Sequence, residues 1–98
     1  MPYIKQTIRE KLDPKIESLG GKIIVTSSSE MVERDGIINY TITKLIGEVY
    51  GPIEKLKYHD FNEIIGMLEC CKLEFYRKQC APYEDIKLKE NGSVLGEQ

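Results

Sequence analysis

The sequence predicts an all-α protein, a small helical bundle whose long central helix covers about residues 60–79 and whose core is completed by oligomerisation. Three observations lead to this prediction. Apolar side chains recur at intervals of three and four residues along most of the chain, which is the spacing of one helix face. Residues that cap or end helices stand between these stretches. A chain of 98 residues buries only roughly 60–65% of its unfolded surface, so a second copy is expected to complete its thin core.

The first expected helix follows Thr7, which stands three residues before Glu10 at the spacing of a capping box. Pro14 comes directly after Asp13 and can bend this helix. The apolar stripe of the helix consists of Ile8, Leu12, Ile16 and Leu19. We expect the helix to end at Gly20–Gly21, because paired glycines weaken a helix.

Residues 22–33 allow two interpretations. Residues 23–25 are β-branched and favour a strand, yet no partner strand is evident elsewhere in the chain. Ser27 and Glu30 have the spacing of a capping box, which favours a short helix instead. The Asp35–Gly36 pair is expected to break the chain after this segment.

The second regular helix is expected from about Ile37 to Tyr50, where Gly51–Pro52 ends it. Its apolar stripe consists of Ile38, Ile42, Leu45, Ile46 and Val49. The linker over residues 53–59 is basic and carries two apolar side chains, so we expect it to follow the protein surface.

The long helix is the clearest element of the sequence. Asp60 and Glu63 have the spacing of a capping box, and the apolar side chains that follow fall within about 120° of arc at 100° per residue. These side chains belong to Phe61, Ile64, Ile65, Leu68, Phe75 and Tyr76. The helix is expected to end near Ala81–Pro82, because the residue before a proline is pushed out of the α region.

The rest of the chain is expected to form one short helix and a tail. Pro82 suits the first turn of a helix, and Asn91–Gly92 is typical of a helix end. We therefore expect a single helical domain over residues 1–92 and a loosely ordered tail over residues 93–98.

Composition argues against several classes of partner. Fourteen basic and sixteen acidic residues give a formal net charge of −2, so the chain lacks the excess of positive charge that binds nucleic acid polymers. No apolar run approaches the roughly 20 residues that span a bilayer, and the N-terminal residues lack a signal-peptide core. We therefore expect a cytoplasmic protein with no membrane partner.

The cysteines are expected to be reduced thiols. Cys70, Cys71 and Cys80 are odd in number and do not have the spacing of a disulfide framework. His59 is the only histidine, and no CxxC pair is present. We therefore expect neither a metal site nor a cysteine nucleophile, since the first needs further ligands and the second an adjacent base.

Lys72 is the most unusual residue of the long helix, because it falls in the middle of the apolar arc. Glu69 stands three residues earlier, where opposite charges can pair, and Asn62 lies two turns before Glu69 on the same edge. In one interpretation Lys72 extends past its apolar neighbours and pairs with Glu69. In the other, Lys72 faces a cleft or subunit interface and binds an anion such as a phosphate, together with Tyr76 and Arg77.

Other polar residues allow further pairings. Asn39 lies at the border of the apolar stripe of the second helix, where its amide needs either an interhelical hydrogen bond or a ligand. Glu74 is spaced to pair with Arg77 or Lys78 on the outer face of the long helix. A magnesium site would need carboxylates from two helices, for example Glu48 with Glu63 or Glu69, and no pair of close carboxylates recurs on both helices.

Several stretches resemble a family of small, uncharacterised helical proteins found in tailed phages and some prokaryotes. They are residues 62–70 (NEIIGMLEC), 72–77 (KLEFYR), 81–85 (APYED) and 90–92 (ENG), together with the similar stretches 1–4 (MPYI), 12–14 (LDP) and 39–45 (NYTITKL). The resemblance implies an all-helical fold and favours a helix over residues 22–33, although Ser27-Ser28-Ser29 departs from a good helix. It implies no established activity.

The helical pattern is also loosely similar to the all-α nucleoside-triphosphate pyrophosphohydrolases, the MazG-like class. That class has carboxylate clusters that bind metal, and this chain does not match them residue by residue. Catalysis by that route is therefore only an alternative.

From these observations we expect a small phage-type, homo-oligomeric binding protein that is not an enzyme and that sequesters a nucleotide or another small anionic signal. It would act in the host cytoplasm if a phage encodes it, and we assign it no catalytic residue, metal or cofactor. Its expected ligand-binding residues are Lys72, Arg77, Tyr76, Glu69, Asn39 and Asn62. The alternatives are a magnesium-dependent pyrophosphohydrolase that uses Glu63, Glu69 and Glu48, and a structural or protein-interaction module.

Overall fold

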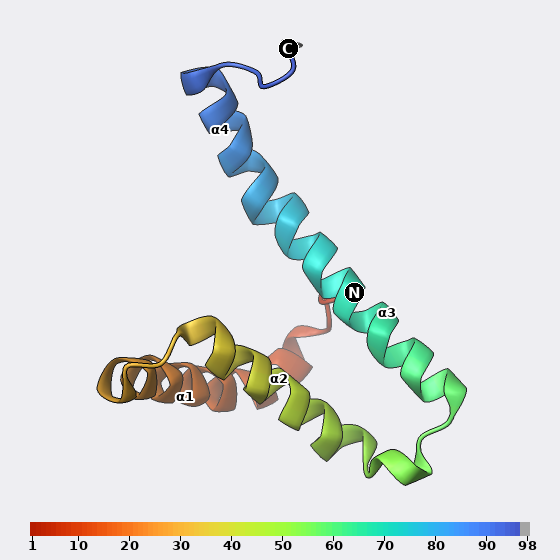
Figure 1. Cartoon of the computed structure of the whole chain (residues 1–98). Coiled ribbons are helices and arrows are strands. Elements are labelled where there is room, and N and C mark those ends of the chain that lie inside the picture. The colour runs from red at the N-terminus through yellow and green to blue at the C-terminus, as the bar shows by residue number, and fades with distance from the viewer. Residues whose placement is uncertain (97–98) are drawn as a thin grey trace. The chain divides into compact units, whose positions relative to one another are not determined.

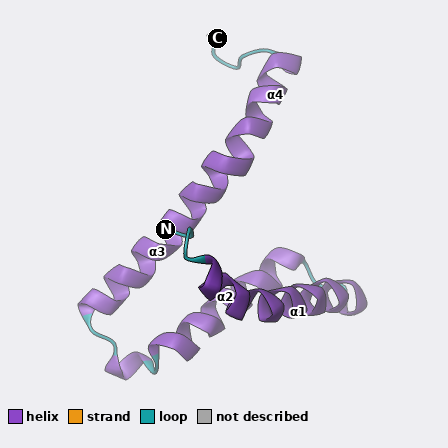
Figure 2. Ribbon diagram, turned by 180° about the vertical axis from the view of Figure 1, so that it is seen from behind, coloured by secondary structure: helices purple, strands orange, loops and turns teal. Residues whose placement is uncertain are grey.

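The computed structural model describes residues 1–96 and is helical along most of its length, with no strand in that range (Figure 2). The prediction of an all-α fold is therefore confirmed. Contacts within the chain define two compact units, one of residues 3–62 and one of residues 1–2 with residues 63 onward. Each unit is described by itself below.

The first unit contains the helices α1, Gln6–Glu30, and α2, Arg34–Tyr50, which contact each other (Figure 1). The expected end of the first helix at Gly20–Gly21 is wrong, because α1 continues through both glycines. A glycine costs a helix only about 1 kcal/mol relative to alanine and keeps its backbone hydrogen bonds, so helical residues on either side can carry it. Pro14 also lies inside α1.

Residues 22–30 belong to α1, so the strand interpretation of the β-branched residues 23–25 is wrong. Extending an existing helix adds one hydrogen bond per residue, whereas a lone strand has no partner for its backbone groups. The helix that the family resemblance implied is correct up to Glu30. Met31 ends α1 in the left-handed conformation, with φ 58°, and its backbone N–H donates to the carbonyl of Ser27.

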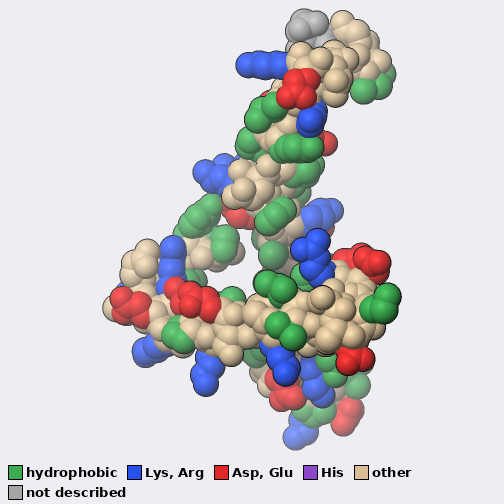
Figure 3. All heavy atoms as spheres, turned by 90° about the vertical axis from the view of Figure 1, so that its left-hand side faces the viewer, with side chains coloured by type: hydrophobic (Ala, Val, Ile, Leu, Met, Phe, Trp, Pro, Cys, Tyr) green, Lys and Arg blue, Asp and Glu red, His purple; other side chains and the backbone are tan. Residues whose placement is uncertain are grey.

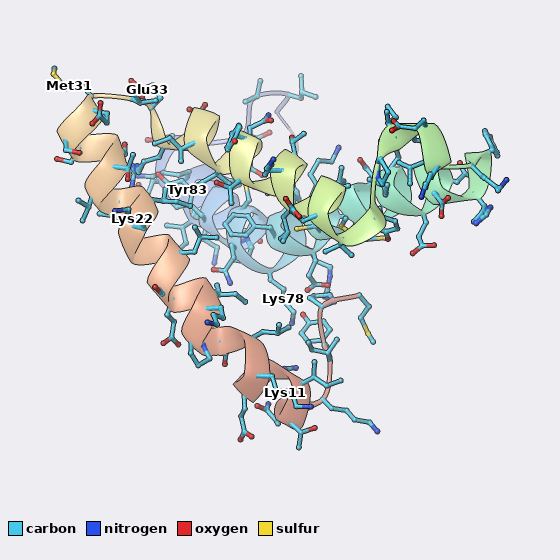
Figure 4. The ribbon with its side chains drawn as sticks, turned by 90° about the horizontal axis from the view of Figure 1, so that it is seen from below. Lys11, Lys22, Met31, Glu33, Lys78 and Tyr83 are labelled. Carbon is cyan, nitrogen blue, oxygen red and sulfur yellow. The ribbon has the colours of Figure 1, made fainter. Side chains whose placement is uncertain are left out.

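The turn between α1 and α2 is short. Met31 and Glu33 lie on it, as Figure 4 shows. The hydroxyl of Ser27 donates to the carbonyl of Val32 at 2.5 Å, and the N–H of Val32 donates back to the carbonyl of Ser27 at 3.1 Å. Half-buried side chains flank the turn on both helices. They belong to Ile23, Thr26 and Ser27 on α1 and to Ile37 and Thr41 on α2.

Helix α2 begins at Arg34, so Asp35–Gly36 does not interrupt the chain as expected but forms the first turn of the helix. An acidic residue stabilises this position through the helix dipole. The predicted end is confirmed, since Gly51 has φ 93° and its N–H donates to the carbonyl of Gly47 at 2.9 Å. A short 3₁₀ helix, η1, follows at Ile53–Lys55.

The long helix begins at Tyr58, and α3 spans Tyr58–Phe75. It continues without a break through the π-helical turn η2, Tyr76–Cys80, into α4, Ala81–Asn91 (Figure 1). At a rise of 1.5 Å per residue, the continuous helix is about 50 Å long. Asp60 lies in its first turn and accepts the backbone N–H of Lys57 at 2.9 Å.

The expected helix end near Ala81–Pro82 is wrong, and the π-helical turn gives the physical reason. Pro82 has no backbone N–H, and its ring clashes with the carbonyl four residues earlier in a regular α-helix. In η2 the N–H of Ala81 donates instead to the carbonyl of Tyr76, five residues back. This wider turn accommodates the proline ring, so the helix continues.

The predicted helix end at Asn91–Gly92 is confirmed. Gly92 has φ 87°, and its N–H donates to the carbonyl of Leu88 at 2.8 Å. Residues 93–96 are not helical. The remaining two residues of the expected tail, 97–98, lie outside the described residues.

Apolar side chains lie mostly on the surface of the helices, as the green patches in Figure 3 show for one face. Among residues 1–96 only Ile64 is buried, with 8% of its surface exposed. Helices α1 and α2 each carry apolar side chains at intervals of four, three and four residues. On α3 the intervals are three, four and three residues, with Lys72 at one of the positions, and all of these apolar side chains are exposed or half-buried. These are Leu12, Ile16, Leu19 and Ile23 on α1, Ile38, Ile42, Leu45 and Val49 on α2, and Ile65, Leu68 and Phe75, with Lys72 among them, on α3. We refer to them as the α1, α2 and α3 stripes.

Candidate functional site

Lys72 lies in the α3 stripe, and its ammonium group is 3.1 Å from a carboxylate oxygen of Glu69. The pairing that the spacing predicted is therefore present. Of the Lys72 side chain, 69% is exposed, so this is a surface ion pair. Such pairs contribute little to stability, typically 0–1 kcal/mol. Lys72 remains a cation among apolar side chains on an accessible face.

Arg77 is bound by an acidic residue one turn earlier. Its guanidinium donates to both carboxylate oxygens of Glu74, at 3.0 and 3.1 Å, as the sequence spacing predicted. Arg77 also lines an open hollow with Met1, Pro2, Cys70, Leu73 and Glu74. Both bonds come from one guanidinium nitrogen, Nη2. An anion that binds Arg77 through this nitrogen must therefore compete with a charge-assisted bond to Glu74.

Tyr76 donates its phenolic O–H to the carboxylate of Glu84, eight residues further on. The pair bridges the π-helical turn, with Tyr76 at its start and Glu84 in the first turn of α4. The hydrogen bond to Glu84 raises the pKa of Tyr76 above its ordinary value of 10.0, and the negative charge of Glu84 adds to this effect. The sequence analysis missed Glu84, because residues eight apart in a regular α-helix are separated by about 12 Å along the axis and about 80° around it, too far for a predictable pair.

The two asparagines of the predicted site are exposed. Asn39 lies on α2, where both its backbone carbonyl and its amide oxygen accept from the hydroxyl of Thr43, at 2.8 and 3.4 Å. This bond lies within one helix rather than between helices. Asn39 also lines an open hollow with Asp35, Gly36, Tyr40 and Thr43. Asn62 lies near the start of α3.

The structure thus places five of the six predicted site residues along one continuous helix, and only Asn39 lies on another. The five are Asn62, Glu69, Lys72, Tyr76 and Arg77. The cations and the phenol each contact a carboxylate from that same helix. Within residues 1–96, no three side chains of His, Cys, Asp and Glu come together as metal ligands would. Cys70 and Cys71 are exposed thiols, and Cys80 is half-buried.

The sequence did not predict how exposed the apolar side chains of the long helix are. Of the apolar arc of the long helix, Ile64 is buried and Leu68 is half-buried, whereas 41% of Phe61 and 67% of Phe75 is exposed. The helical spacing of these residues was readable from the sequence, but spacing identifies a face and not what covers it. In the described part of the chain, no helix is both long enough and apolar enough to cross a membrane.

Comparisons with known proteins bear on the identity of the chain. No curated protein and no solved structure matches it. A family model described as a domain of unknown function, DUF6899, matches residues 1–94, which is nearly the whole chain. The chain therefore belongs to the DUF6899 family.

Proposed function

We propose that this chain is a self-associating helical module whose working form is a homo-oligomer held together by the α1, α2 and α3 stripes. The observation that carries the proposal is the large total accessible surface, together with the exposure of the apolar side chains in the three stripes. The chain has an accessible surface of 8916 Å², whereas a folded monomer of 11.3 kDa exposes about 5,700 Å². The difference is about 3,200 Å².

This difference is large enough for stable association. A stable interface between two proteins buries roughly 800 Å² of each partner, about a quarter of the difference. The stripes have the residue spacing of helix-to-helix packing, and contiguous exposed apolar patches mark interaction surfaces. The α2 stripe contains apolar side chains only. Leu45 and Val49 are consecutive members of it, and both are exposed.

The test is the mass of the protein in solution as a function of concentration, measured by light scattering after gel filtration. We expect a multiple of 11.3 kDa at high concentration. Leu45→Gln should lower the mass at a given concentration, because it places an amide in the α2 stripe. Glu48→Gln, on the same helix but outside the stripe, should leave the mass unchanged. A mass of one chain at every concentration would overturn the proposal.

Binding of a small anion is a second candidate, supported by the exposed ammonium group of Lys72 among aromatic and apolar neighbours. A phosphate group could replace Glu69 as the partner of Lys72. A panel of nucleotides should then raise the melting temperature of the protein. Lys72→Gln should remove this shift, whereas Lys89→Gln on α4 should not. No shift with any nucleotide would contradict this candidate.

The same nucleotide panel with Mg²⁺ tests the pyrophosphohydrolase alternative. Release of pyrophosphate would support an enzyme, whereas nucleotide that is retained intact would support sequestration. A protein that associates but neither binds nor cleaves nucleotides would be an interaction module alone.

A further inference from the structure

The α3 stripe has a pattern that specifies how two copies can pair. Ile65, Leu68, Lys72 and Phe75 follow one another at intervals of three, four and three residues. These intervals place Ile65 and Lys72 at the a positions of a heptad repeat and Leu68 and Phe75 at the d positions. We propose that this stripe packs against the same stripe of a second copy in antiparallel orientation, and that Lys72 sets the orientation. The inference rests on the proposed self-association and adds its geometry.

Lys72 disfavours the parallel orientation. In a parallel pair of helices each a residue packs against the same residue of the partner, so the two Lys72 side chains would meet in the seam. Two like charges that lose solvent together repel each other. The apolar residues alone do not disfavour the parallel orientation, since isoleucine at a with leucine at d, as in Ile65 and Leu68, is typical of parallel pairs. The lysine therefore opposes the orientation that its neighbours favour.

The antiparallel orientation removes this conflict, because each a residue then packs against a d residue of the partner. Lys72 lies opposite Leu68 of the second copy, and Ile65 lies opposite Phe75. The four stripe residues thus form four complete layers around a two-fold axis near residue 70. Such an interface is self-complementary and closes with two copies, as symmetric dimers require.

Glu69 makes the antiparallel arrangement favourable electrostatically. It lies at position e, on the same side of the helix as Lys72, and its carboxylate is already 3.1 Å from the lysine ammonium group. In an antiparallel pair the two e positions face each other. Both Glu69 carboxylates therefore meet both Lys72 ammonium groups, and four charges of alternating sign surround the axis.

Cys71, which the chain already contains, is placed to report the orientation of the pair. It is an exposed thiol at position g, one residue from the expected two-fold axis. Position g faces g in an antiparallel pair, so the two Cys71 thiols are neighbours. In a parallel pair, position g faces position e, and the two thiols lie on opposite sides of the seam. Cys70, at position f, points away from the seam in either orientation.

The orientation is tested by cross-linking two single-cysteine chains with a short bis-maleimide. One chain keeps Cys71 and carries Cys70→Ser and Cys80→Ser, and the control keeps Cys70 and carries Cys71→Ser and Cys80→Ser. We expect a covalent dimer of the first chain and little of the second, both at a concentration at which light scattering shows association. Association without cross-linking through Cys71 would overturn the antiparallel seam and leave self-association intact. A single-chain mass throughout would overturn both.

The role of the charges is tested by mixing two variants. Glu69→Lys gives each copy positive charges at both positions 69 and 72, and Lys72→Glu gives each copy negative charges at both positions. Each variant alone should associate at least tenfold more weakly than the parent, and an equimolar mixture should recover association. In either variant positions 69 and 72 of one chain carry like charges and cannot pair with each other, so recovery reports charges that pair between chains. Lys89→Glu and Glu90→Lys are controls outside the stripe and should leave association unchanged. Failure of the mixture to recover would contradict the role of Lys72 and Glu69.

Discussion

Lys72 carries a positive charge at a position of α3 that is otherwise apolar. Its place among apolar residues was readable from helical periodicity, and so was its pairing with Glu69, because both depend only on positions within one helix. The structure confirms the pair at 3.1 Å. It adds that the surrounding apolar side chains are themselves accessible. Lys72 is thus a charge in the middle of an exposed stripe rather than at the edge of a core.

Two glycines predict opposite effects of the same substitution. Gly21 lies within α1 and is exposed, with no atom near the position that a Cβ would take. Gly21→Ala should therefore raise the free energy of unfolding by about 0.5–1 kcal/mol. Gly51 ends α2 with φ 93° and ψ −173°, a backbone conformation that essentially only glycine adopts. Gly51→Ala should therefore lower the free energy of unfolding by about 1–3 kcal/mol. Urea unfolding followed by circular dichroism measures both, and equal effects of the two substitutions would contradict the assignment of the helix end.

The hydrogen bond between Tyr76 and Glu84 predicts a dependence on alkaline pH. The raised pKa of Tyr76 means that the folded chain holds the phenol proton more tightly than the unfolded chain. The contribution of this bond is therefore present below the ordinary pKa of 10.0 and is lost as pH rises through the pKa of Tyr76. A titration of the tyrosine rings by nuclear magnetic resonance should show a lower pKa of Tyr76 in Glu84→Gln. The control Glu90→Gln should leave it unchanged.

At the scale of elements, the largest difference from expectation is the continuity of the helices. Helix α1 passes through Gly20–Gly21, and the long helix passes Pro82 by means of the π-helical turn η2. Local propensities predicted a break at both places. Helix formation is cooperative, so residues on both sides can extend a helix through a weak point when no alternative structure competes. The helix ends at Gly51 and Gly92 were predictable, because a residue with positive φ cannot continue a helix.

The π-helical turn predicts a coupled effect of Pro82→Ala. Alanine restores the backbone N–H and removes the ring that the wide turn accommodates, so the segment should return to regular α-helix. The helix beyond it then rotates, and Glu84 moves out of line with Tyr76. We expect the pKa of Tyr76 to fall as it does in Glu84→Gln, while helical content by circular dichroism is retained. An unchanged pKa of Tyr76 would show that the pair does not depend on the π-helical turn.

At the scale of the whole molecule, folding and association should be linked. A chain whose described residues bury only Ile64 gains little from apolar burial within one copy. Association that buries the stripes stabilises the folded state by mass action. The melting temperature should therefore rise with protein concentration. Thermal unfolding at two concentrations a hundredfold apart measures the effect, and Leu45→Gln should reduce it. A melting temperature independent of concentration would argue for a monomer.

The sequence by itself determined the helical class, the C-terminal ends of α2 and α4 and the apolar spacing along each helix. It also determined the pairs Glu69–Lys72 and Glu74–Arg77. All of these depend on residues within a few positions of one another. Only the tertiary structure decided that α1 and the long helix are continuous, that Glu84 meets Tyr76, and that the apolar stripes remain exposed. Periodicity shows which side chains share a face, but burial depends on which other surface comes to cover that face.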